Sequence, residues 1–123
     1  MNPAETFSQP LSVTFEDVPG ACVVRLVGTP GMENVNPHHE QLLDRIDDET
    51  PNVVADLSKL TFINSPVLAM LVHAHKKTHE HNGRVVIVRP SAVIARVLRL
   101  MHVERLFSEY ATVDAALAAL AGR

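Results

Sequence analysis

The sequence contains seven histidines, and a neutral imidazole is both a common metal ligand and a proton carrier. Four of these histidines lie between positions 73 and 81. On a helix, His75 and His79 share a side, whereas His73 and His75 lie roughly 160° apart. Two ligands with Lys76 and Lys77 between them, and with no carboxylate at helical spacing, do not complete a zinc site. The pattern therefore favours the polar border of a helix over a metal site, and a histidine metalloprotein is only the enzymatic alternative.

Motifs for nucleophilic catalysis and for phosphate binding are absent. The glycines form neither a Gly-x-Gly-x-x-Gly nor a P-loop pattern after an apolar segment, and no Gly-x-Ser-x-Gly pattern marks a nucleophile. Cys22 is the single cysteine and stands in an apolar run, so we expect a small buried side chain. We therefore expect no catalytic residues, no cofactor and no enzymatic activity.

Ser65 is a candidate for chemistry of another kind. It follows an apolar segment, precedes Pro66 and begins the longest amphipathic segment of the chain. Serine followed by proline is typical of an N-cap and first turn, so we expect Ser65 to cap a helix. A phosphate on its hydroxyl would add about 1.5 to 2 negative charges at the positive end of that helix, which tolerates them. Ser65 is therefore a candidate phosphoacceptor.

Five strands are predicted around these residues. Residues 12–16 alternate polar and apolar side chains, which is typical of a half-buried strand, and residues 22–27 are apolar and largely β-branched. Pro19 and Gly20 between them suit the centre of a type II turn, which predicts an antiparallel hairpin. The later predicted strands are residues 52–58, residues 84–88 and a short edge strand within 106–110.

Helices are predicted between the strands. The first begins at Asn36 as N-cap and exposes His38 and His39 to solvent. It should stop early, because the acidic run at 47–49 lies at the negative end of the helix dipole. The other predicted helices are Pro66–His81, closed by Asn82 and Gly83, and two helices capped by Ser91 and Thr112.

The alternation of strands and helices predicts the fold class. Crossover connections require parallel pairing after the first hairpin. We therefore expect an α/β fold with a mixed β-sheet, made of an antiparallel N-terminal hairpin plus parallel strands and covered by about four α-helices. Residues 12–121 are expected to form a single domain after a short N-terminal lead at 1–11.

Composition and charge exclude some classes of function. The chain has 123 residues, of which 46% are hydrophobic and 20% are charged, and no apolar run reaches the roughly 20 residues of a membrane span. No signal peptide pattern is present, so we expect a cytoplasmic protein. Residues 1–60 carry a net charge of -7 and residues 61–123 carry +4. The acidic half argues against nucleic acid as a partner.

The chain resembles the STAS domain family of bacterial anti-sigma factor antagonists. The resemblance is strongest over Val53–Ser65 and continues through Gly83–Val88 and Val97–Phe107. In that family the strand signature ends in Asp-Ser-Ser-Gly, and the first serine is phosphorylated by a partner that is both a serine protein kinase and an anti-sigma factor. The unphosphorylated antagonist binds that partner and frees the sigma factor. The resemblance thus implies transcription regulation through protein–protein interaction, with Ser65 as the phosphoacceptor.

The four signature positions here are Asn64, Ser65, Pro66 and Val67, so only the acceptor serine is kept. The resemblance implies a partner-binding surface made of these four residues and, from the preceding loop, Met32 and Glu33. A diverged STAS interaction domain that is not phosphorylated, in a stress-signalling or transporter-associated complex, is the alternative. The sequence is compatible with a homodimer.

Overall fold

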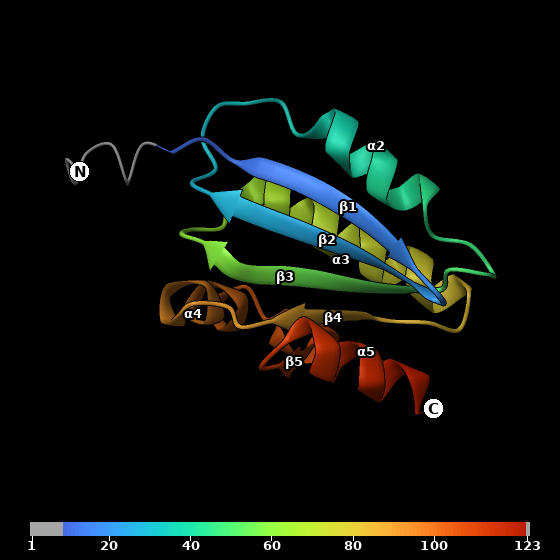
Figure 1. Cartoon of the computed structure of the whole chain (residues 1–123). Helices are drawn as coiled ribbons and strands as arrows, with labels where there is room; N and C mark the ends of the chain where they lie inside the picture. The colour runs from blue at the N-terminus through green and yellow to red at the C-terminus, as the bar shows by residue number, and fades with distance from the viewer. Residues whose placement is uncertain (1–8, 123) are drawn as a thin grey trace.

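The computed structural model describes residues 9–122 and has one mixed β-sheet with helices on both faces (Figure 1). The sheet has the strand order β1-β2-β3-β4-β5. β1 pairs with β2 antiparallel, and every later pair is parallel, as the sequence predicted. The strands are β1 (Ser12–Val18), β2 (Ala21–Gly28), β3 (Asn52–Leu60), β4 (Val85–Val88) and β5 (Ser108–Tyr110).

The predicted turn between β1 and β2 is confirmed by the backbone. Gly20 has a φ of +79°, a conformation that glycine adopts without steric cost. The turn starts a register in which Val18 faces Ala21 and Ser12 faces Val27. The hairpin therefore places Gly28, at the end of β2, at the opposite end of the sheet from the turn.

Four α-helices and one short 3₁₀ helix occur between residues 9 and 122. They are α2 (Asn36–Asp44), α3 (Ser65–Glu80), α4 (Ala92–Leu100), η1 (Glu104–Leu106) and α5 (Val113–Ala121). Ser91 and Thr112 cap α4 and α5 as predicted, each accepting a hydrogen bond from a backbone N–H three residues on. No helix in this part of the chain is long and apolar enough to cross a bilayer.

The start of α2 differs from the prediction, and its end agrees with it. Val35, not Asn36, is the N-cap residue, so no side chain caps this helix. His38 and His39 are half-buried rather than solvent-facing, because α3 packs beside them. α2 ends at Asp44, before the acidic run, and Asp47 instead accepts hydrogen bonds from the backbone of Thr50 and its neighbour.

The end of α3 is fixed by a close backbone approach. Asn82 has a φ of 62°, in the left-handed region, and Gly83 N donates to Thr78 O at 2.8 Å. A Cβ on Gly83 would lie 2.0 Å from Pro51 O. The predicted closure of the helix by Asn82 and Gly83 is confirmed, and Gly83 is required by space rather than by its φ.

The two faces of the sheet are covered unequally. α3 passes behind the strands in Figure 1 and α5 lies in front of them. The larger core joins α2, α3 and α4 to one face, and the smaller core joins α5 to the other. Successive side chains of β3 alternate between them, since Val53 and Ala55 belong to the larger core and Val54 to the smaller. Three helices are thus held in one layer, each starting at the carboxyl end of a parallel strand.

Candidate partner-binding site

Two loops meet at the carboxyl end of the parallel strands. One joins β2 to α2 and the other joins β3 to α3, and both lie at the left of Figure 1. Backbone and side-chain hydrogen bonds connect them. Thr61 N donates to Gly28 O at 3.0 Å, and the hydroxyls of Thr29 and Thr61 lie 2.7 Å apart. The loop after β2 and the loop after β3 are therefore joined to each other at one end of the sheet.

Asn64 both caps α3 and holds the neighbouring loop. Its Oδ1 accepts from Val67 N at 3.2 Å, and its Nδ2 donates to Gly31 O at 3.4 Å. The expectation that Ser65 is the N-cap was wrong by one residue. An aspartate at this position would also cap the helix but has no N–H for Gly31. The asparagine therefore adds a contact that the family's aspartate does not make.

Ser65 is the first residue of α3, and its side chain is exposed. No hydrogen bond joins its hydroxyl to another residue of the described chain. The amides that follow are few, because Pro66 has no N–H, Val67 N donates to Asn64 Oδ1, and Leu68 N donates to Asn64 O at 2.9 Å. A phosphate on Ser65 would therefore feel the helix dipole but would find almost no amides of its own chain.

Val67 does not lie at this surface, although the family resemblance placed it there. Its side chain is fully buried in the larger core, with Met70, Leu71 and Ala74 of the same helix. The spacing of these residues turns them all towards the sheet. Pro66, one residue earlier, is exposed.

The loop after β2 presents the other predicted contact residues. Met32 is fully exposed, with a relative accessibility of 102%, and the carboxylate of the exposed Glu33 accepts from Gly31 N. Phe62, in the loop after β3, is 44% exposed and was not singled out from the sequence. An aromatic side chain between the end of a strand and the helix start was the available signal. Met32 and Phe62 thus give each of the two loops an apolar side chain in solvent.

Histidines and the cysteine take no part in this site. The described residues include no cluster of three or more side chains that could hold a metal ion. The rings of His75 and His79 are stacked with centroids 6.2 Å apart, as their spacing on the helix predicted. Cys22 is fully buried, and this burial raises the pKa of its thiol to about 11. The thiol is therefore a buried apolar side chain, as expected.

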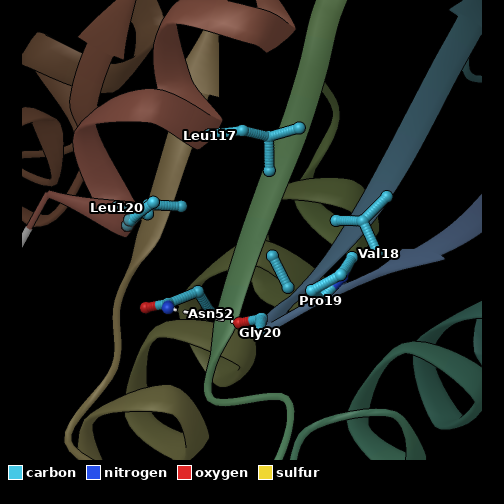
Figure 2. Close-up of a pocket in the computed structure, with 8 residues that line it drawn as sticks. Val18, Pro19, Gly20, Asn52, Leu117 and Leu120 are labelled. Atoms are coloured by element: carbon cyan, nitrogen blue, oxygen red, sulfur yellow. Dashed lines mark hydrogen bonds between the residues drawn. The ribbon is translucent and has the colours of Figure 1, made fainter.

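A hollow of about 250 Å³ lies at the opposite end of the sheet, between the β1–β2 turn and the end of α5 (Figure 2). Leu117 and Leu120 form one wall. Asn52 donates to Gly20 O at 3.2 Å and accepts from Arg84 N at 3.0 Å, so both of its polar atoms have partners. This hollow is far along β3 from Ser65 and is not part of the partner-binding site.

Sequence comparison identifies the family. The STAS domain family matches residues 12–116, and the chain belongs to this family. A search among curated proteins finds no match.

Solved structures agree with this assignment. An anti-sigma factor antagonist from Mycobacterium paratuberculosis is 26% identical, with a TM-score of 0.75 over 90% of this chain and 94% of that one. The anti-sigma factor antagonist SpoIIAA in its unphosphorylated form is 18% identical, with a TM-score of 0.80 over 91% and 98%. The phosphorylated form of the Bacillus cell fate determinant SpoIIAA is 16% identical, with a TM-score of 0.73 over 88% and 98%. The latter two show that the fold is shared.

Proposed function

We propose that this chain is an anti-sigma factor antagonist that binds an anti-sigma factor with serine kinase activity and is released when Ser65 is phosphorylated. Membership of the STAS family and the likeness to the mycobacterial antagonist support the class. The observation that carries the switch is the exposed hydroxyl of Ser65, which Asn64 leaves free by taking over the cap of α3.

The binding surface in this proposal is made of the two connected loops. It comprises Asn64, Ser65 and Pro66 at the start of α3, Met32 and Glu33 after β2, and Phe62 after β3. Met32 and Phe62 supply apolar area that a partner would remove from water. Asn64 holds both loops in one arrangement through Gly31, so little ordering is needed on binding.

The switch acts through charge. The partner transfers the γ-phosphoryl group of ATP, bound with Mg²⁺, to Ser65 Oγ; the hydroxyl proton passes to a base of the kinase, and ADP leaves. The product carries about 1.5 to 2 negative charges in the middle of the binding surface. Because the start of α3 offers few amides, this charge stays directed at the partner rather than being neutralised within the chain. Burying it against the partner costs binding free energy.

Kinase assays with purified components test this function. The protein is incubated with each anti-sigma factor kinase of its source bacterium and Mg-ATP, and intact mass and binding are measured. We expect one phosphoryl group on the wild type and on Ser91→Ala, none on Ser65→Ala, and binding that ends with phosphorylation. A phosphoryl group on Ser65→Ala, or wild-type binding that survives phosphorylation, would refute the switch.

The signature positions also favour a second candidate function. Asn64, Pro66 and Val67 replace three of the four family residues, and Pro66 stiffens the backbone beside the acceptor. The second candidate is a STAS interaction module of a stress-signalling or transporter-associated complex that binds without being switched. The same experiment separates the two, because this module would bind its partner equally with and without ATP.

A further inference from the structure

The contacts between α2 and α3 follow one spacing. Each contact joins a residue of the α2 segment to a residue 33 or 34 positions later, on or beside α3. We call this set the α2–α3 seam. Its pairs are Gly31 with Asn64, His39 with His73, Leu43 with Lys77, and Asp48 with His81. The seam begins at Gly31, so its first contact lies directly beside Met32 and Glu33 of the partner-binding loop.

One contact of the seam joins two imidazole rings, His39 of α2 and His73 of α3. His73 Nδ1 and His39 Nε2 lie 2.9 Å apart, and the ring centroids are 4.8 Å apart. One nitrogen donates a proton and the other must accept it, so at least one ring has to be neutral. Two protonated rings would place two donors and two positive charges against each other. The contact therefore persists when both rings are neutral or when one of them is protonated, but not when both are protonated.

The surroundings oppose the second proton. Burial, followed by the nearby His73, lowers the pKa of His39, while Glu40 beside it acts in the other direction. Lys76 and Lys77 occupy the next turn of α3, and the Lys77 ammonium donates to Leu43 O. The strands beneath α2 and α3 contribute apolar core side chains. Glu40, the next residue along α2, is the carboxylate that favours protonation of His39.

The far end of the seam joins a histidine to a carboxylate. His81 Nδ1 lies 2.7 Å from Asp48 Oδ1, so this imidazole faces an acceptor rather than a second ring. Asp48 is 93% exposed, so this contact contributes little stability in water. His81 is therefore a control for the contact between His39 and His73, because it lies on the same seam without a second histidine against it.

We propose that His39 and His73 are positioning residues for the partner-binding loop, and that double protonation of this pair separates α2 from α3 and weakens partner binding. The part concerning binding rests on the proposed function, whereas the separation of the helices does not. An unfolded histidine titrates near 6.5, and the folded His39 titrates lower. The contribution of neutral His39 to the free energy of unfolding is therefore complete above a pH of about 6.5. It is lost as the pH falls towards the lower pKa of folded His39, and below that pKa the free energy no longer changes through this group.

The first test needs no partner. Urea unfolding, and hydrogen exchange of residues 31–44 corrected for intrinsic rates, are measured between about pH 7.5 and pH 5 for the wild type, His39→Gln, His73→Gln and His81→Gln. Glutamine keeps a neutral hydrogen-bonding group that does not titrate. We expect faster exchange of α2 in acid for the wild type and for His81→Gln, and a flat profile for His39→Gln and His73→Gln. Equal acid profiles in the wild type and His39→Gln would overturn the proposal.

The second test measures binding to the partner from the kinase assay over the same pH range. We expect roughly fivefold weaker binding in acid for the wild type and no change for His39→Gln. The same weakening in both proteins would overturn the link to the binding loop. If no kinase binds while the exchange profiles behave as expected, the proposed function fails and the helix separation stands.

Discussion

The starts of α3 and α4 invite comparison, because both helices follow parallel strands at the same end of the sheet and both begin beside a serine. At α4, Ser91 is the N-cap and its Oγ accepts from Ile94 N at 3.2 Å. At α3, Asn64 is the N-cap and the serine is moved to the first helical position. Ser91 thus occupies the N-cap position of its helix, and Ser65 occupies the position after the N-cap. One hydroxyl is used by the backbone, and the other faces solvent.

A modifiable serine can thus stand at a helix start while another side chain caps the helix. The Oγ of a serine that caps is held by its own backbone, so a phosphoryl group on it would alter the hydrogen bond that makes the cap. A serine one position later keeps the favourable end of the dipole while a neighbour does the capping. Asn64 therefore separates the stability of α3 from the chemistry of Ser65.

The largest expected effect at these helix starts separates a buried from an exposed position, since the third residues of both helices, Val67 and Ile94, are fully buried. Val67 is the third residue of α3 and is fully buried, whereas Val93 is the second residue of α4 and is 54% exposed. Val67→Ala should lower the free energy of unfolding by about 2 kcal/mol, from lost apolar burial and the cavity left behind. Val93→Ala should change it by less than about 0.5 kcal/mol. Urea unfolding measures both, and equal losses would show that Val67 is not held in the core.

Removing either cap should lower the stability by the same amount, but only one of the two removals should loosen a neighbouring loop. Asn64→Ala and Ser91→Ala should each lower the free energy of unfolding by about 1 kcal/mol. Only Asn64→Ala should also speed hydrogen exchange in the loop that contains Gly31, because only Asn64 contacts a second loop.

Asn64→Asp separates the two roles of this side chain. It should keep the stability of α3, since aspartate caps well, and still loosen the loop, since it cannot donate to Gly31 O. If Asn64→Asp protects the loop as well as the wild type does, the contact with Gly31 contributes nothing to its order.

Local physics predicted much of the fold from the sequence. The strands, the turn at Gly20 and the caps Ser91 and Thr112 follow from patterns within a few residues, and the structure confirms them. At α3 the sequence has two adjacent side chains that can cap, Asn64 and Ser65, and the Ser-Pro pattern favoured the wrong one. Asn64, the cap in the structure, also contacts Gly31, which is 33 residues away along the chain and lies beyond the reach of a local pattern.

Two further differences between the sequence analysis and the structure have a related origin. Helical spacing alone places Val67 on the apolar face of its helix, where the structure has it, whereas the family signature placed it at the partner surface. The contact between His39 and His73 was missed because it joins two helices through the topology of the sheet. Sequence patterns locate residues along an element, and the register between elements becomes visible only in the structure.

The smallest effect concerns a negative charge at the first position of each helix. Neither α3 nor α4 has an acidic residue in its first turn, and Ser65 and Ala92 occupy equivalent positions. Ser65→Asp and Ala92→Asp should each raise the free energy of unfolding by about 0.5 kcal/mol at low salt, through the helix dipole, and lose the gain at high salt. Ser65→Asp should nevertheless weaken partner binding, while Ala92→Asp leaves it unchanged.

Urea unfolding at two salt concentrations measures the stability of both variants, and binding to the kinase measures the effect on the partner. Lower stability of Ser65→Asp alone would mean that charge at this site acts by disturbing α3, and weaker binding would then no longer report on charge at the interface.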